Sequence, residues 1–324
     1  MTRAPVAVMA GLCCFFCGSR AVFADGGETS AAFLSIDKSP RSAAMGGASC
    51  ALAEGVEGME HNPAGLVYGG AEVMLSHLEW FAGLKNDYAA ATLPLSSSLA
   101  VGVSGNYFHS SPIASYDSRG GQLSDVKPWE GAAALGLGIE LEKGCAVGFT
   151  GKYITQSMGG AKAAAYAADV GLYQKLEHWS GGAVVENVGT QLQLASVPFD
   201  LPLVYKLGFA WLPDTRLALS AQAAKPQSDK LQFSSGVEYK LPLSAYAASF
   251  RAGYRYLPDE GTGDGFCYGF GFDFGSLRVD YAYVPYGNLG ATHRMALVIK
   301  FSERKKPPRS KKAKQRTLEG FSPA

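Results

Sequence analysis

Apolar and polar residues alternate along most of the chain, from Glu72 to Phe301. In the clearest stretch, 266–274, every second residue is aromatic, and Cys267, Gly269, Gly271 and Asp273 lie between them. A period of two places successive side chains on opposite faces of a β-strand. Most of the alternating segments have roughly 8 to 11 residues, about the length of a tilted strand that crosses a bilayer. Fourteen segments start near Glu72, Asp87, Leu99, Glu130, Cys145, Tyr166, Ser180, Leu203, Arg216, Lys230, Tyr246, Phe266, Leu277 and His293.

The two faces of these segments favour a membrane barrel. One face is aromatic or aliphatic, and the other carries Gly, Ala, Ser and scattered charges such as Lys152, Asp169 and Glu238. An outer-membrane barrel turns its apolar face to lipid, and closure removes sheet edges that lipid cannot satisfy. We therefore expect an all-β fold, a fourteen-stranded antiparallel transmembrane β-barrel over residues 72–301. A secreted β-sandwich or propeller is the alternative.

Large aromatic residues lie near several of the expected strand ends. Amphipathic rings prefer the boundary between lipid and water, so we interpret them as an interfacial girdle. Ordinary core aromatics are the alternative. The residues are Trp80, Trp129, Trp179, Trp211, Tyr239 and Tyr256.

The N-terminus is typical of a secretory signal peptide over residues 1–24. Arg3 is followed by an uncharged run over 4–19, and Val22-Phe23-Ala24 offers small residues for cleavage before Asp25. A membrane anchor is the alternative, as is lipoprotein processing at Cys13, Cys14 or Cys17. Cleavage would leave Cys50, Cys145 and Cys267, which can form at most one disulfide.

Charge is distributed unevenly. The 324 residues carry a net charge of +1, which gives no reason to expect nucleic-acid binding. Residues 302–324 hold eight Lys and Arg against two Glu, so we expect a basic, disordered tail. It is either simply solvated or in contact with an anionic surface.

The segment before the barrel, residues 25–71, is rich in Ala and Gly and carries two motifs. They are Met45-Gly46-Gly47-Ala48, preceded by Ser42, and Asn62-Pro63-Ala64-Gly65-Leu66. This pairing resembles the N-terminal signature of the FadL/PorV-like outer-membrane proteins, which include long-chain fatty acid transporters. The closing segments, from Asp280 to Arg294, also look like that family, in particular like its spirochaetal branch. The resemblance covers residues 31–301 and implies a barrel plugged by an N-terminal hatch inside the lumen.

The resemblance also implies roles for individual residues. Hatch movement would gate the lumen, and the third strand would carry a lateral opening at Gly102 and Gly105, where we expect a kink or bulge. Gly is common in these strands, which is the alternative explanation. The hatch and gating residues would be Met45, Gly46, Gly47, Asn62, Pro63 and Ala64. Independently of the resemblance, the alternation places polar residues on the face expected to line the lumen, namely Arg251, Arg255, Asp273, Arg278 and Asp280.

The expected function is passive uptake of hydrophobic molecules such as long-chain fatty acids through the outer membrane. The expected partners are these ligands, outer-membrane lipid and the barrel-assembly machinery. A PorV-like scaffold that binds a secreted protein is the main alternative, and an open polar porin is a lesser one. We expect no enzyme, cofactor or metal site, because the five His have no metal-ligand spacing and the Gly-x-Gly pairs fall within strands.

Overall fold

The computed structural model describes residues 29–194, 197–258 and 265–302. The expected signal peptide, with Cys13, Cys14 and Cys17, and the expected tail beyond Ser302 lie outside the described residues. No helix in the described ranges is long and apolar enough to cross a membrane.

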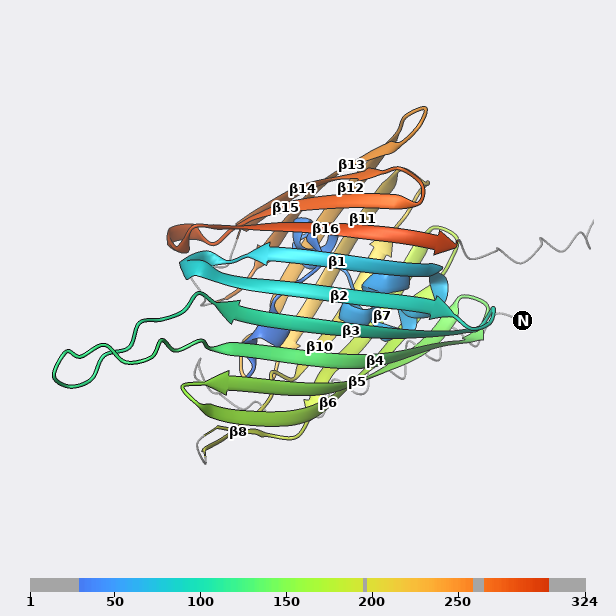
Figure 1. Ribbon diagram of the computed structural model, residues 1–324. Coiled ribbons are helices and arrows are strands. Elements are labelled where there is room, and N and C mark those ends of the chain that lie inside the picture. The colour runs from blue at the N-terminus through green and yellow to red at the C-terminus, as the bar shows by residue number, and fades with distance from the viewer. Residues whose placement is uncertain (1–28, 195–196, 259–264, 303–324) are drawn as a thin grey trace, which may run out of the picture.

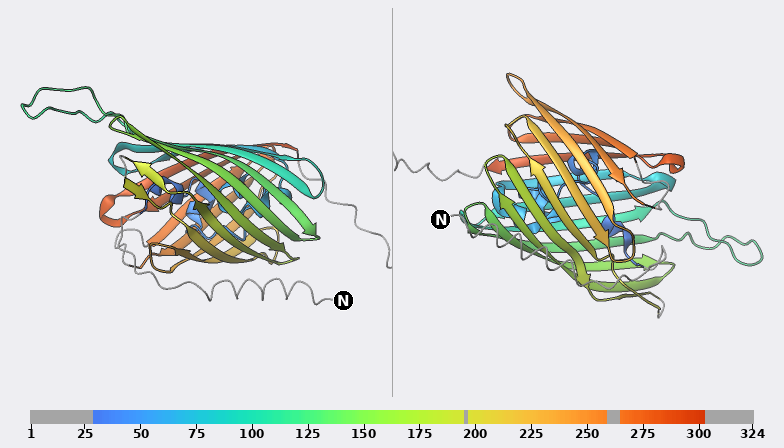
Figure 2. Two further views of the ribbon diagram at one scale, coloured as in Figure 1. Left: turned by 90° about the horizontal axis from the view of Figure 1, so that it is seen from below. Right: turned by 180° about the vertical axis from the view of Figure 1, so that it is seen from behind.

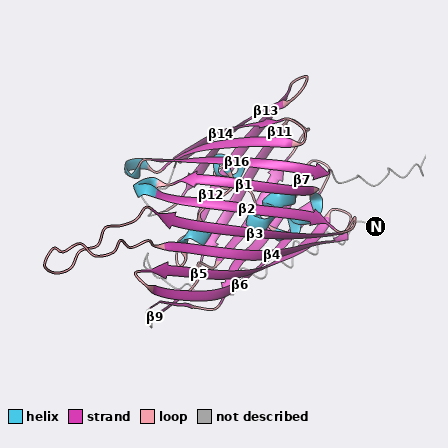
Figure 3. Ribbon diagram, in the orientation of Figure 1, coloured by secondary structure: helices cyan, strands magenta, loops and turns pink. Residues whose placement is uncertain are grey.

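Fourteen antiparallel strands close into a barrel (Figures 1 and 3), which confirms the expected fold. Each expected start lies within five residues of the observed one. Closure occurs where β1 pairs with β16, from Ala71 with Ser302 to Glu79 with His293. The barrel strands are β1 (Ala71–Glu79), β2 (Leu84–Pro94), β3 (Leu99–Ser110), β4 (Trp129–Glu142), β5 (Cys145–Met158), β6 (Ala161–Lys175), β7 (Trp179–Gly189), β10 (Val204–Trp211), β11 (Leu217–Pro226), β12 (Gln232–Pro242), β13 (Ala247–Tyr256), β14 (Gly265–Asp273), β15 (Leu277–Pro285) and β16 (Ala291–Ser302).

The alternation places apolar side chains on the outside of the wall. On β14, Phe266, Tyr268 and Phe270 are exposed, whereas Cys267 and Gly271 are buried. The expected girdle residues Trp179 and Trp211 are also exposed, and their rings stack with centroids 5.7 Å apart. Trp80 differs from them, because its ring packs against Tyr286 and the guanidinium of the buried Arg294.

The two ends of the barrel differ. Short turns join the strands at the end where β1 begins and β16 ends, which we call the turn end. The other end, the loop end, carries the longer connections, including residues 111–128, which project well beyond the wall (Figure 1). It also carries η5 (Phe81–Gly83), η6 (Gly287–Leu289) and a small hairpin of β8 (Leu192–Leu194) and β9 (Val197–Phe199).

Residues 29–70, here called the hatch, lie inside the barrel, where Figure 2 shows their short helices enclosed by strands. A buried apolar cluster joins the hatch to the wall, with Val56, Met59 and Leu66 packed against Met74 and Tyr173. The hatch expected inside the lumen is therefore present there, and it is built of short helices. Its elements are η2 (Ala32–Ser35), α2 (Pro40–Ala44), η3 (Gly55–Glu57), α3 (Gly58–His61) and η4 (Pro63–Tyr68).

The pairing of the third strand has no register shift, so the bulge expected at Gly102 and Gly105 was wrong. β3 pairs without a break with β2 from Ala100 to Ser110 and with β4 from Leu99 to His109. The wall register does shift between β6 and β7, at Ala168 and Val170. There Asn187 adopts a positive φ of 61°, and its backbone N–H donates to Asp169 Oδ1.

Candidate functional site

The Asn-Pro-Ala motif anchors the hatch to the wall. Asn62 is fully buried, and its Nδ2 donates to the carbonyl of Cys50 at 2.9 Å and to that of Leu172 on β6 at 3.0 Å. Its Oδ1 accepts from the backbone N–H of Ala64 at 3.1 Å, which caps η4, while Pro63 occupies the first turn, where no N–H is needed. One side chain thus joins two hatch segments to the barrel.

Glycines of the wall make room for this motif. A Cβ added to Gly171 would lie 2.2 Å from Asn62 Oδ1, and one added to Gly148 would lie 2.1 Å from the Ala64 nitrogen. Both distances are far below van der Waals contact, so only glycine allows the hatch backbone to lie against β5 and β6.

The Met45-Gly46-Gly47 motif makes the same kind of contact on the other side of the lumen. Ser39 caps the start of α2, and the buried Met45 follows the last residue of that helix. A Cβ on Gly253 of β13 would lie 2.2 Å from the Gly46 nitrogen. Gly46 and Gly47 follow with φ of 69° and 84°, a region that side chains rarely adopt. Both sequence motifs are therefore places where the hatch backbone lies directly against glycines of the wall, as the Cys50 carbonyl also does against Gly182.

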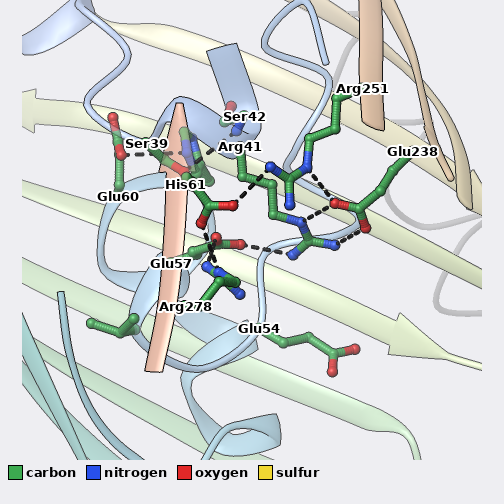
Figure 4. Close-up of polar contacts among 12 residues, drawn as sticks. Ser39, Arg41, Ser42, Glu54, Glu57, Glu60, His61, Glu238, Arg251 and Arg278 are labelled. Atoms are coloured by element: carbon green, nitrogen blue, oxygen red, sulfur yellow. Dashed lines mark hydrogen bonds and ion pairs between the residues drawn. The ribbon is translucent and has the colours of Figure 1, made fainter. Parts of the chain in front are cut away.

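Six charged side chains form a closed ring between hatch and wall, here called the ion ring (Figure 4). Arginines and carboxylates alternate around it. Two members belong to the hatch, and four come from β12, β13 and β15. In order, the ring is Arg41, Glu238, Arg251, Asp280, Arg278 and Glu57, which bonds back to Arg41.

Two of the ring's contacts join hatch to wall. Arg41 of the hatch donates from Nη2 to Glu238 Oε1 at 2.8 Å and from Nε to Oε2 at 2.9 Å, a bidentate pair. Arg278 of β15 donates to Glu57 of the hatch at 2.5 Å. Within the hatch, Arg41 also donates to Glu57 at 2.9 Å. Three arginines face three carboxylates, so the ring has no net formal charge.

The ring also sets the ionisation of its hatch members. Burial alone would raise the pKa of the Glu57 carboxyl, but the guanidinium groups of Arg41 and Arg278 outweigh that effect and hold this pKa below its ordinary value. Burial likewise opposes the charge on Arg41, yet Glu238 and Glu57 hold the pKa of its guanidinium well above the usual range. Both hatch members are therefore charged at neutral pH.

Further contacts hold the hatch near the turn end. Lys175 Nζ lies 2.5 Å and 2.7 Å from the two carboxylate oxygens of Glu54. Tyr173 Oη donates to the Ala51 carbonyl at 2.8 Å. Cys50 is buried between β7 and β10, and its thiol donates to the Gly182 carbonyl at 3.4 Å. Burial raises the pKa of this thiol to about 12, so the closed hatch keeps it protonated and unreactive.

The two glycines of the third strand face opposite sides of the wall. Gly102 faces inward, and a Cβ there would lie 2.4 Å from Met59 Sδ of the hatch. Gly105 faces outward, with open space around the position of a Cβ. It lines a depression of about 720 Å³ in the wall, beside Leu75, Ala89 and Tyr107.

The structure brings together three of the five polar residues expected in the lumen, because Arg251, Arg278 and Asp280 are members of the ion ring. Asp273 lies toward the turn end, 2.9 Å from Lys300 Nζ. Arg255 lies toward the loop end, where its Nη1 donates to Tyr286 Oη at 3.3 Å.

The sequence did not identify the hatch members of the ring, Arg41 and Glu57, nor Arg294 in the wall. Arg294 is almost fully buried and donates to Tyr286 Oη at 3.2 Å, so it lies beside Arg255. The described cysteines Cys50, Cys145 and Cys267 are all unpaired.

The sequence matches no protein-family model and no curated protein. The fold, in contrast, is similar to solved structures of channels. The CymD monoaromatic hydrocarbon channel is 13% identical, with a TM-score of 0.58 over 82% of this chain and 98% of that one. The Pseudomonas putida toluene transporter TodX is 14% identical, with a TM-score of 0.57 over 86% of this chain and 98% of that one. A Pseudomonas aeruginosa FadL homologue is 11% identical, with a TM-score of 0.53 over 82% and 98%. At these identities the similarity establishes the fold alone, which this chain shares with those structures.

Proposed function

We propose that this protein is an outer-membrane channel for small hydrophobic molecules and that movement of the hatch opens it. The observation that carries the proposal is the placement of the hatch. It lies inside the barrel and is held there by non-covalent contacts, namely the ion ring, the Asn62 hydrogen bonds and glycine-faced packing. Such contacts can form and break repeatedly, and the fold is shared with hydrocarbon channels.

A lateral exit through the wall is part of this proposal. The depression at Gly105 opens on the lipid-facing side of β1, β2 and β3, and its outward lining includes Leu75, Ala89 and Met295. A hydrophobic molecule that leaves here enters the membrane without crossing an aqueous phase. Inside the same part of the wall, Gly102 contacts Met59, so hatch movement would change the packing behind the depression.

Long-chain fatty acids are the cargo that we propose. Near the loop end, Arg255 and Arg294 each have two buried guanidinium nitrogens without a hydrogen-bond partner. An unpaired buried donor is unfavourable by about 1–3 kcal/mol, and a carboxylate is the group that guanidinium donors bind best. Trp80 and Tyr286 provide apolar surface beside them. An acid with an apolar chain fits this arrangement better than a neutral hydrocarbon does.

A disulfide that locks the hatch tests the gating. Cys50 Sγ lies 2.5 Å from the position of a Cβ added to Gly208 of β10, and about 3 Å separates such atoms in a disulfide. A Gly208→Cys variant should therefore form a bond with the native Cys50 after a small shift. The Gly208→Cys variant is produced in a host without its own fatty acid transporter. We expect oxidation of the two thiols to abolish uptake of radiolabelled oleate, and reduction of the disulfide to restore it.

Gly208→Ser is the matched control, since it adds a side chain of similar size and cannot form the bond. Undiminished oleate uptake through fully cross-linked protein would refute gating by the hatch. Toluene uptake measured in parallel identifies the cargo. An Arg294→Met variant should lose uptake of oleate and retain that of toluene if the guanidinium pair selects an acid.

The projecting segment 111–128 supports a second candidate function, a surface scaffold for a protein. It forms an extended hairpin in which Ile113 and Val126 exchange backbone hydrogen bonds. Ile113, Tyr116 and Leu123 are large apolar residues exposed on it. Crosslinking in native membranes before and after deletion of 113–126 tests this function. A protein partner captured at unit stoichiometry and lost on deletion would support it, whereas its absence would leave transport as the function.

A further inference from the structure

Three potential metal ligands meet inside the hatch, apart from the ion ring. Asp37 precedes α2, while Glu60 and His61 end α3. One ligand atom from each residue lies within 4.8 Å of the other two. His61 Nε2 is 3.5 Å from Asp37 Oδ1 and 3.4 Å from Glu60 Oε2. Figure 4 shows Glu60 and His61 on the same side of the ring as Ser42.

All three of these atoms are buried and have no hydrogen-bond partner. The side chain of His61 is only 8% exposed, and that of Glu60 only 5%. Buried polar atoms in native proteins are almost always satisfied, so three orphans that face one another are unusual. They indicate that something is bound between them.

The second oxygen of each carboxylate is already occupied. Asp37 Oδ2 accepts a hydrogen bond from Ser42 Oγ at 2.8 Å, and Glu60 Oε1 accepts one from the backbone N–H of Lys38. These bonds orient the carboxylates so that their free oxygens face the imidazole. Outer hydrogen bonds of this kind fix first-shell ligands in metal sites.

The distances from His61 Nε2 to the two carboxylate oxygens fit a shared metal ion better than a shared proton. If His61 were an imidazolium between two carboxylates, its charge-assisted hydrogen bonds would measure about 2.7–2.9 Å, well below the 3.4 and 3.5 Å observed. Atoms that coordinate a tetrahedral zinc ion at about 2.1 Å lie about 3.4 Å apart. An imidazole with two carboxylates favours zinc over calcium or magnesium, which take oxygen ligands.

The surrounding charge is also compatible with a divalent cation. The two carboxylates contribute a formal charge of −2, and a neutral His61 contributes none. Lys38 is one nearby cation, and its Nζ lies 3.8 Å from Glu60 Oε1, the oxygen that is already hydrogen-bonded. Lys206 and Arg255 also interact electrostatically with Asp37. The free oxygens of the cluster are therefore left for an ion.

We propose that Asp37, Glu60 and His61 form a zinc site in the hatch, with the fourth position taken by water. The ion would join the segment before α2 to the end of α3, directly before Asn62. It would thereby fix the hatch backbone that presents the Asn-Pro-Ala motif to the wall. This proposal does not depend on what the channel carries.

Metal analysis of the purified full chain tests the proposal. The protein is stripped with chelator, incubated with zinc chloride, freed of excess ion and analysed by mass spectrometry for bound metal. A His77→Gln background disrupts the outward group in which His77 and His109 both contact Asp87, so that adventitious zinc held there does not add to the count. We expect one zinc per chain, and an affinity at least about 100-fold lower in His61→Ala and in Asp37→Asn.

His178→Gln is the matched control, because it removes an exposed histidine from the turn between β6 and β7. It should bind one zinc per chain, like its parent. Cobalt substitution gives a second readout, since a tetrahedral site produces strong visible absorption that His61→Ala should lack. Circular dichroism verifies that each variant forms the barrel. Absence of tight zinc from the parent, or unchanged binding in folded His61→Ala, would overturn the proposal.

Discussion

Glu57 is the ring member whose removal should release the hatch most clearly. Its two carboxylate oxygens contact Arg41 at 2.9 Å and Arg278 at 2.5 Å, and its side chain is 7% exposed. Glu57→Gln keeps the shape and removes the charge, which leaves a net positive charge in the buried ring. Removing one partner of a buried ion pair typically destabilises by about 3–5 kcal/mol. Even the lower value raises the released population about 100-fold, since about 1.4 kcal/mol is a factor of ten.

The native Cys50 reports this release directly. In the closed hatch its thiol is buried, and a pKa of about 12 keeps it protonated, so a maleimide can modify it only after the hatch opens. Labelling of the Cys50 peptide, followed by mass spectrometry, should therefore proceed about 100-fold faster in Glu57→Gln. Glu177→Gln, which alters an exposed carboxylate in a turn, should label at the parent rate. Equal rates in folded Glu57→Gln and parent protein would refute the idea that the ring holds the hatch.

Three further outcomes follow from the hatch contacts. The pKa of Glu57 is lowered in the closed state, so its stabilisation is complete above the ordinary value of 4.5 and is lost as the pH falls through the lower, closed-state pKa. Hydrogen exchange of the hatch amides is measured and corrected for the intrinsic exchange rate at each pH. It should be faster than at neutral pH only when the pH falls below about 4.5. Gly171→Ala would place a Cβ 2.2 Å from Asn62 Oδ1 and should weaken hatch seating by about 1–3 kcal/mol, seen as faster Cys50 labelling, whereas Gly151→Ala, with open space around it, should not. Asn62→Ala removes three hydrogen bonds and should make closure of the hatch less favourable by about 2 kcal/mol, seen as faster labelling of Cys50. Slower labelling than in the parent would contradict this prediction.

The barrel could be predicted from the sequence because its information is local. Each strand alternates on its own, and Phe266, Tyr268 and Phe270 reveal which face meets lipid without reference to any other strand. The same alternation placed Arg251, Arg278 and Asp280 inside. Their position in a ring, however, depends on which strands become neighbours.

The hatch contacts are not local, and this is why most of them were missed. Arg41 and Glu238 are 197 positions apart, and Arg41 lies in a segment without a regular period. His61 was judged by its spacing from other histidines, whereas its neighbours in space include Asp37. The expected bulge at Gly102 failed for another reason. A missing Cβ permits both an irregular strand and the close approach of a second backbone or side chain, and here Met59 occupies that space.

The composition of the ion ring bears on how the hatch can leave. The hatch contributes Arg41 and Glu57, which remain bonded to each other, and the wall contributes Glu238, Arg251, Asp280 and Arg278, which remain bonded in a row. Departure therefore divides the six residues into two electroneutral groups, and neither surface is left with an orphan charge. Such a division avoids much of the free-energy cost of leaving a buried charge without its partner. It also lets the hatch return to a wall whose ion pairs have stayed in place.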